Sequence, residues 1–438
     1  MLKNKNLKQS HDRFLKEHNL PEKTCFAPYI NLDLDQGGGI LPCFRSKEWS
    51  GNWKKNGPIE DYNNETFQKL RNDLHNNKFP NSCRVCANRE ENNLHSIRYE
   101  FFAMLMDNNT KKEVLDIVDH IKTDHKKFKT EHITSLEIRP HNHCNLECMH
   151  CNGFSSTKWQ ATTKKNKDVL SDDEMFEELF IDYHSDNDLD TEKWISVNNP
   201  SAMEDFFSKA KNIKDVHFTG GEPIMDKTHE KWLNLIENKS KINLGYHTNL
   251  QHKLYNKLFD TWKQFKYIEI YNSWDACERL YPYFRYHGNF SALTDNLQAI
   301  RTSFKNSKRL KIRGTLTVNF FSLFDFKDHI DMWTKFDMEP HHSYVEHTHP
   351  ISLCWLPVEL RNDLLNQATE HALNMENSDI KESVLNMIDD IRDFANQKND
   401  HYDYIPEQTK KFILTMDKIR NTNIIEVCPE LTKYFQGE

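Results

Sequence analysis

Three cysteines on one short segment give the sequence its clearest chemical signal. Cys144, Cys148 and Cys151 lie in RPHNHCNLECMHCNG, residues 139–153, directly after alternating apolar residues that predict a β-strand over Ser135–Arg139. Three thiolates on one loop can bind three irons of a cubane iron–sulfur cluster and leave the fourth iron without a protein ligand. Such an iron is free to bind a substrate or cofactor directly.

The same loop also permits a zinc site. Zn²⁺ is bound by tetrahedral sets of cysteine and histidine, and His141, His143 and His150 all lie beside the three cysteines. The loop alone does not decide between iron–sulfur and zinc, so the surrounding sequence has to be considered.

A second motif, TGGEP at residues 219–223, favours the cluster. It follows a predicted strand over Asp215–Phe218, the next strand of the same type along the chain. Two adjacent glycines allow the backbone to approach a ligand closely, and the carboxylate of Glu222 beside them can bind an ammonium group. The motif is weak by itself but specific when it follows a three-cysteine loop on the preceding strand.

Together, the two motifs resemble those of the radical S-adenosylmethionine (radical SAM) enzymes. The resemblance implies that S-adenosylmethionine chelates the open iron of a 4Fe-4S cluster bound by Cys144, Cys148 and Cys151. It also implies that one electron cleaves the cofactor and that the resulting 5′-deoxyadenosyl radical abstracts a hydrogen atom. The positions that match the family's cofactor contacts are Gly220, Gly221, Glu222, Pro223, Asn249, Ser273, Asp275 and Arg285. For the last four, the open alternative is a helix cap or a solvent-exposed side chain.

Four more cysteines lie near the N-terminus, in an order that predicts a second metal site. Alternating residues predict strands over Ala27–Asp35 and Ile40–Arg45, joined by a turn, and a helix over Glu65–Asn77. The cysteines stand before, within and after these elements: Cys25, Cys43, Cys83 and Cys86.

This segment resembles the SPASM and twitch modules that accompany many radical SAM enzymes. The resemblance implies an auxiliary 4Fe-4S cluster, although the module here precedes the barrel instead of following it and has cysteines for one cluster only. A four-cysteine zinc site satisfies the same spacing and stays open as an alternative.

The rest of the chain predicts an α/β fold, a partial (β/α)6 barrel of the radical SAM type with an N-terminal α+β module and C-terminal helices. Strands that alternate with helices imply a parallel sheet, with chemistry at the carboxyl ends of the strands.

We expect four regions: the module at 1–107, a helical linker at 108–134, the barrel at 135–356 and a helical extension at 357–438. The six predicted barrel strands are Ser135–Arg139, Asp215–Phe218, Ile242–His247, Tyr267–Asn272, Leu310–Val318 and Ser343–His347. An acidic insertion over Thr163–Asn199 is expected to be a solvated loop with one helix, and the alternative is a lid that contacts a basic substrate.

Composition limits the possible partners. The 438 residues carry a net charge of −8, which gives no general reason to bind nucleic acid, and no apolar stretch is long enough to span a membrane. Ten cysteines without an export signal argue against disulfides, so we expect a cytoplasmic protein. The isolated Cys277, Cys354 and Cys428 are expected to be buried structural thiols, with a third cluster as the alternative.

The substrate is not encoded in any motif. The resemblance to SPASM and twitch modules favours a peptide or protein substrate and an electron donor such as flavodoxin or ferredoxin. The alternatives are a small molecule, such as a sugar or nucleoside, and a non-catalytic zinc-binding scaffold.

Overall fold

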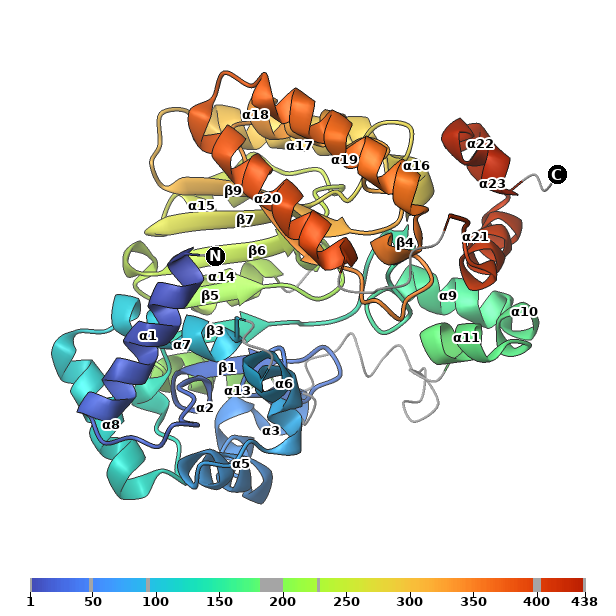
Figure 1. The fold of residues 1–438 in the computed structure, drawn as a ribbon. Helices are drawn as coiled ribbons and strands as arrows, with labels where there is room; N and C mark the ends of the chain where they lie inside the picture. Colours follow the sequence, from blue (N-terminus) through green and yellow to red (C-terminus); the bar gives the residue numbers. More distant parts are fainter. Residues whose placement is uncertain are drawn as a thin grey trace. The chain divides into compact units, whose positions relative to one another are not determined.

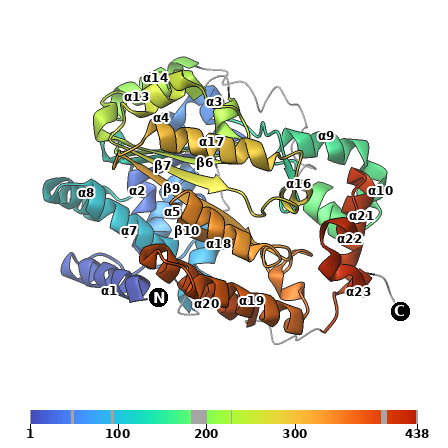
Figure 2. The same cartoon turned by 90° about the horizontal axis from the view of Figure 1, so that it is seen from above.

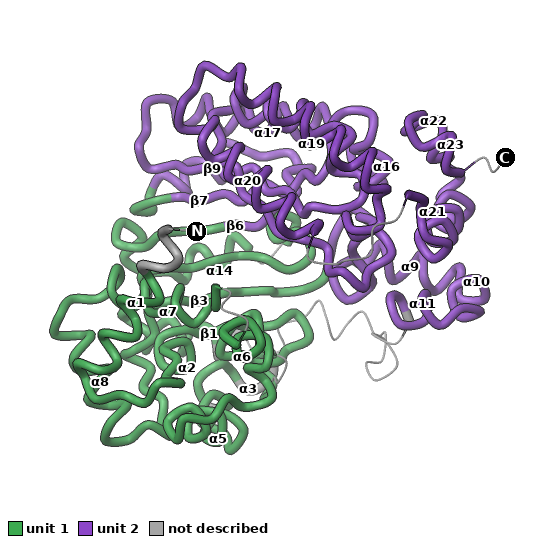
Figure 3. Tube along the Cα trace, in the orientation of Figure 1, with its two compact units in different colours: residues 1–142, 190–245, 264–267 green, residues 143–189, 246–263, 268–438 purple. Residues whose placement is uncertain are grey.

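The computed structural model of the protein describes residues 2–46, 50–91, 95–181, 200–226, 229–396 and 403–435. The chain divides into two compact units (Figure 3). Unit 1 consists of residues 1–142, 190–245 and 264–267, and unit 2 of residues 143–189, 246–263 and 268–438. The division is interleaved along the chain, and strand β6 (Asn243–Thr248) begins in unit 1 and ends in unit 2. The four predicted domain ranges therefore stay predictions.

Unit 1 contains a mixed sheet in the order β2-β1-β3-β5. Strand β1 (Asn31–Leu34) pairs antiparallel with β2 (Ile40–Leu41) and parallel with β3 (Ser135–Ile138), and β3 pairs parallel with β5 (Asp215–Phe218). The predicted N-terminal hairpin thus forms, and its first strand extends the sheet that carries the first two predicted barrel strands.

Both strands of the hairpin are shorter than predicted. Residues Ala27–Ile30 form the helical turn α2, with Pro28 in its first turn, where the fixed φ of proline suits a helix. Strand β2 ends at Leu41 because Pro42 follows it and has no N–H to donate to a sheet.

Several helices of unit 1 share one buried apolar core. Helices α1 (Leu2–Glu17), α7 (Ile97–Asn108) and α8 (Lys111–Asp124) lie together (Figure 1), and Phe14, Phe102 and Ile117 belong to one buried cluster. Helix α8, inside the predicted linker, starts with a capping box between Thr110 and Glu113 and packs its apolar face into this core. The unit also contains α3 (Trp53–Asn56), α4 (Pro58–Asp61), α5 (Glu65–His75), α6 (Arg84–Glu91), α13 (Pro200–Lys209) and α14 (His229–Leu235).

Unit 2 continues the strand–helix alternation with parallel strands. Strand β9 (Leu310–Val318) pairs on one side with β7 (Tyr267–Ser273) and on the other with β10 (Glu339–Tyr344). Helix α20 (Ser378–Asn396) packs on β10, α19 (Val358–Leu373) packs on α20, and α18 (Phe326–Lys335) packs on α19 (Figure 2). The helices of this unit include α15 (Asn256–Trp262), α17 (Phe290–Ser303), α18 (Phe326–Lys335), α19 (Val358–Leu373), α20 (Ser378–Asn396) and α21 (Glu407–Arg420).

The last barrel strand lies earlier than predicted. We expected it over Ser343–His347, but β10 spans Glu339–Tyr344, in register with β9 so that Glu339 lies opposite Arg313. These two side chains form an ion pair of 2.9 Å. The sequence EPHHSY has no apolar alternation, so the pattern could not indicate this strand.

The predicted α/β class is confirmed. Parallel strands alternate with helices in both units, and the six predicted barrel strands correspond to β3, β5, β6, β7, β9 and β10, an order that fits a partial barrel. Of the predicted acidic insertion, residues 182–199 lie outside the described residues, so the predicted lid is not described. Within the described part of the chain, no helix is long and apolar enough to cross a membrane.

Substituting Gly314→Ala in β9 should destabilise the protein by about 1–3 kcal/mol through overpacking. The Trp333 indole donates to the Gly314 carbonyl at 2.9 Å, and a Cβ on Gly314 would lie 2.3 Å from the indole nitrogen. Urea unfolding should show a lower midpoint for this variant, whereas Gly37→Ala, at an exposed turn, should leave it unchanged. Equal midpoints for both variants would contradict the packing described here.

Candidate functional site

A small two-stranded sheet holds the three-cysteine loop within unit 2. Strand β4 (Glu147–Cys148) pairs antiparallel with β8 (Arg285–Tyr286), which places Cys148 directly opposite Arg285. The backbone N–H of Met149 continues the pairing by donating to the carbonyl before Arg285 at 2.9 Å. The loop is therefore fixed by a segment that lies far away in the sequence.

The helix after the loop fixes its other side. Ser156 caps α9 (Thr157–Lys165), and its hydroxyl also donates to the Leu146 carbonyl at 2.6 Å. The Trp159 indole donates to the Cys148 carbonyl at 2.9 Å. Buried carbonyls in the loop thus obtain partners from the first turn of α9.

Arg420, the last residue of α21, also supports the loop. Its guanidinium donates to the Glu147 carbonyl at 2.6 Å and lies over the rings of Trp159 and Tyr286, 5.0 and 5.1 Å from their centroids. The side chain is buried. Sequence reasoning missed this residue, because its place at the end of a predicted helix gives no signal of a contact with the cysteine loop.

The three cysteines lie together in a positively charged setting. Cys144 and Cys148 are buried in one cluster, with Cys151 packed against it. The Cys151 thiol donates a hydrogen bond that, together with the Arg285 charge, lowers the pKa of Cys148 despite its burial. The same hydrogen bond, together with burial, raises the pKa of Cys151. A low-pKa thiol beside an arginine is suited to bind a metal as thiolate.

Asp275 and Arg285 form a buried ion pair beside this loop. The Asp275 carboxylate accepts from Arg285 at 2.5 Å and from the Thr317 N–H at 2.7 Å, and it lies 3.7 Å from His150 Nε2. Burial alone would raise the pKa of Asp275, but Arg285, His150 and the Thr317 amide hold it below its ordinary value. Asp275 is therefore held ionised, and His150 points to it.

Asn249 and Ser273 are the other predicted cofactor residues of unit 2. The Asn249 amide donates to Asn145 at 3.0 Å and lies 3.8 Å from the Cys144 sulfur, so Asn249 belongs to the loop's surroundings. Ser273 ends β7 in register with Thr315, and its side chain is half-buried. The structure thus gathers Cys144, Cys148, Cys151, Asn249, Asp275 and Arg285 in one region of unit 2.

The predicted cofactor motif of unit 1 forms a tight turn. Gly220 has a φ of +110°, and a Cβ there would lie 2.9 Å from the His141 carbonyl oxygen. The N–H of Gly221 donates to the same carbonyl at 3.1 Å. The turn therefore requires glycine at position 220, and it is hydrogen bonded to the backbone that leads, three residues later, to Cys144.

Glu222 and Pro223 complete this motif. Pro223 opens a short 3-10 helix, and the buried Glu222 carboxylate caps it by accepting from the Ile224 N–H at 3.2 Å. The motif therefore holds a buried carboxylate at the start of this short helix.

The four N-terminal cysteines line one cavity of unit 1, together with Arg45 and Arg98. Burial and the neighbouring thiols raise the pKa of Cys25 well above its usual value, and burial raises the pKa of Cys43. The lining residues include Cys25, Cys43, Cys83 and Cys86. The four predicted ligands thus line one cavity. Arg45 and Arg98 line the same cavity, where their positive charges would face any thiolates that form.

The sulfur atoms of these cysteines do not form close groups of three. Among the described residues, which include all seven of these cysteines, no three of them have sulfur atoms that all lie within 4.8 Å of one another. Four thiolates on one Zn²⁺ at 2.3 Å would lie about 3.8 Å apart. No histidine of the described chain forms such a group with two of these cysteines, and His141 Nε2 lies 3.6 Å from Asp226.

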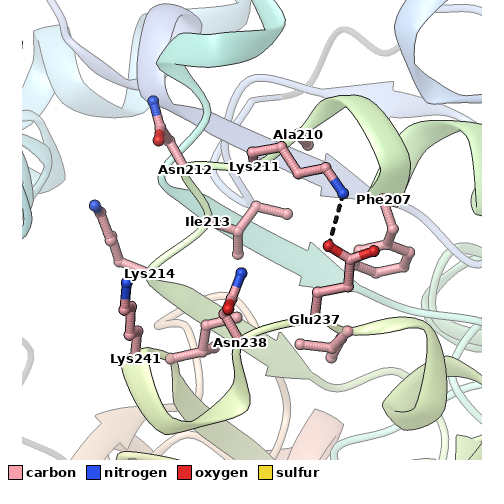
Figure 4. A pocket seen from close by; sticks show the side chains of 11 residues that line it. Phe207, Ala210, Lys211, Asn212, Ile213, Lys214, Glu237, Asn238 and Lys241 are labelled. Atoms are coloured by element: carbon pink, nitrogen blue, oxygen red, sulfur yellow. Dashed lines mark hydrogen bonds and ion pairs between the residues drawn. The ribbon is translucent and has the colours of Figure 1, made fainter.

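A further cavity of unit 1 lies away from the predicted chemistry. It is formed by the loops that precede β5 and β6, where Lys211 pairs with Glu237 at 2.7 Å (Figure 4). This is the amino end of the strands, whereas parallel α/β folds place their chemistry at the carboxyl end. We assign it no function.

Comparison with known proteins gives only structural matches. No family model and no curated protein matches the chain. SuiB of Streptococcus suis bound to S-adenosylmethionine aligns at 14% identity over 79% of this chain and 69% of SuiB, with a TM-score of 0.34. Native anSMEcpe with bound AdoMet aligns at 14% identity over 54% of this chain and 60% of its own, with a TM-score of 0.34. TYW1 with a lysine-pyruvate adduct aligns at 16% identity over 57% of this chain and 78% of its own, with a TM-score of 0.30. TM-scores below 0.5 carry no argument about function, so the site is interpreted from its own residues.

Replacing Arg285 by Met should destabilise the protein by about 3–5 kcal/mol at pH 7, because it leaves Asp275 buried without a partner. In the wild type, the depressed pKa of Asp275 adds stability above about pH 4, which is lost as pH falls through that pKa. In the variant the pKa of Asp275 rises, so the destabilisation should shrink as acid protonates the unpaired carboxylate.

Unfolding at several pH values measures this difference. Arg309→Met, at an exposed position before β9, should change stability by no more than about 0.5 kcal/mol at any pH. A deficit for Arg285→Met that stays constant between pH 7 and pH 5 would contradict the proposed ion pair.

Proposed function

We propose that this protein is a radical SAM enzyme that reductively cleaves S-adenosylmethionine at a 4Fe-4S cluster bound by Cys144, Cys148 and Cys151. The supporting observation is a loop with three cysteines that pack together beside a buried arginine. The Gly220–Glu222 turn gives further support, because its backbone is hydrogen bonded to His141, which stands three residues before Cys144.

When bound, the cluster would supply the electron that cleaves the cofactor. The protein's own residues would hold the charges and exclude water. Arg285 and Arg420 would offset the negative charge of the thiolates, and Asp275 would keep Arg285 in place. Glu222 would accept the cofactor's amino group, and Asn249 would donate near Cys144.

Cys25, Cys43, Cys83 and Cys86 would bind an auxiliary 4Fe-4S cluster. The supporting observation is the cavity that the four cysteines share. Arg98, which lines the cavity and donates to the Thr24 carbonyl at 2.9 Å, would compensate thiolate charge. The cluster would relay an electron or bind substrate.

We infer that the substrate is a peptide or protein, since the N-terminal module resembles those of enzymes that act on peptides. The electron donor would be a small redox protein such as flavodoxin or ferredoxin. A short peptide encoded next to this protein would be the first substrate to test, by mass change under reducing anaerobic conditions; a sugar or nucleoside is the alternative.

Anaerobically purified protein should contain about eight irons if both clusters are cubanes, and should form 5′-deoxyadenosine from S-adenosylmethionine with a reductant. Replacing Cys144, Cys148 and Cys151 by Ala should leave about four irons and abolish 5′-deoxyadenosine. Cys354→Ala, a buried thiol outside both sites, should change neither quantity. Zinc without iron, together with no 5′-deoxyadenosine from the wild type, would instead identify a non-catalytic scaffold.

The auxiliary site has its own test. Replacing Cys83 and Cys86 by Ala should reduce iron from about eight to about four per chain and leave the spectroscopic signal of S-adenosylmethionine binding at the other cluster intact. Unchanged iron content would refute the auxiliary cluster without affecting the catalytic one.

A further inference from the structure

A third group of potential ligands lies in unit 2, apart from both cysteine sets. Among the described residues, Cys277, Asp325 and His329 form the one group whose potential ligand atoms all lie within 4.8 Å of one another. Cys277 follows the end of β7, Asp325 is the N-cap residue of α18, and His329 lies in the first turns of that helix. All three side chains are at most 3% exposed.

The three side chains face one another closely. The Cys277 sulfur lies 3.5 Å from His329 Nδ1, and His329 Nε2 lies 3.3 Å from Asp325 Oδ1. The Cys277 N–H donates to the other carboxylate oxygen of Asp325 at 2.5 Å.

Asp325 is the N-cap residue of α18, but its side chain does not cap the helix. An N-cap aspartate normally accepts a hydrogen bond from the first amides of its own helix, but this side chain accepts none of them. Asp325 Oδ1 and His329 Nε2 are both buried and form no hydrogen bond in the described structure, although they lie 3.3 Å apart as an ion pair. A bound cation would satisfy the carboxylate oxygen and the ring nitrogen.

The surroundings of this group are negatively charged. Burial first, and then the charges of Asp325, Asp328 and Glu278, raise the pKa of the Cys277 thiol well above its usual value. The nearby Arg279 is engaged by Glu430, with an ion-pair distance of 2.6 Å. A buried carboxylate in such a field is stable when a cation accompanies it.

We propose that Cys277, Asp325 and His329 bind a divalent transition-metal ion, with Zn²⁺ as the best match to one sulfur, one nitrogen and one oxygen ligand. Binding would release the thiol proton to solvent, leaving a thiolate on the metal. The ion would tie the end of β7 to the start of α18, two segments that are distant in sequence. This proposal does not depend on the proposed radical SAM function.

Zinc and iron contents of the full chain, purified anaerobically with Zn²⁺ in the medium, test the site. We expect about one zinc per chain in addition to the iron, and a loss of at least about tenfold in Cys277→Ser and His329→Gln with iron unchanged. The matched control is Cys354→Ser, because Cys354 pairs with His347 at 3.0 Å but belongs to no three-ligand group of the described residues. Its zinc content should equal that of the wild type. Absence of zinc from the wild type, or equal zinc in all variants, would overturn the proposal.

X-ray absorption at the zinc edge of the unmodified protein gives a second test that needs no variant to fold. The proposed site predicts one sulfur at about 2.3 Å and nitrogen or oxygen ligands at about 2.0–2.1 Å. Four sulfur ligands would place the zinc at the N-terminal cysteines instead and would overturn the assignment.

Discussion

The pairing of Cys148 with Arg285 across two short strands is the interaction on which the rest of the site depends. A loop with three thiols, two of them buried, would become negatively charged if it bound metal as thiolates, and a buried charge is stable only with a partner. The β4–β8 sheet supplies that partner by backbone geometry, because register alone sets Arg285 opposite the cysteine. Asp275 then holds the arginine from the other side.

The same principle recurs at the other two groups of cysteines. In unit 1, four thiols share their cavity with Arg45 and Arg98, so cationic side chains are already present. Around Cys277 the neighbouring charges are carboxylates, and the nearby arginine is bound elsewhere. All three sites thus have an arginine nearby that is paired with a carboxylate: Arg285 with Asp275, Arg98 with Glu90 and Arg279 with Glu430.

Sequence patterns predicted the parts of this structure that depend on local periodicity. The strand before the cysteine loop, strands β5 and β9 and helix α5 lie where alternation and helical spacing placed them. The last strand was predicted too late in the chain, because β10 lacks the apolar alternation that a half-buried strand usually shows. Its pairing with β9 and its packing against α20 hold it in place instead. The structure places Asn249 and Asp275 beside the cysteine loop, and their predicted contacts with a cofactor stay predictions. Arg420 could not be found, since a contact between a helix end and a loop so distant in sequence leaves no trace in spacing.

The contact of Arg420 has a consequence for local opening. Its guanidinium joins the last turn of α21 to the Glu147 carbonyl, 273 residues away along the chain. If α21 frayed at this end, the buried carbonyl would lose that donor. Fraying of the helix end and loosening of the cysteine loop are therefore coupled.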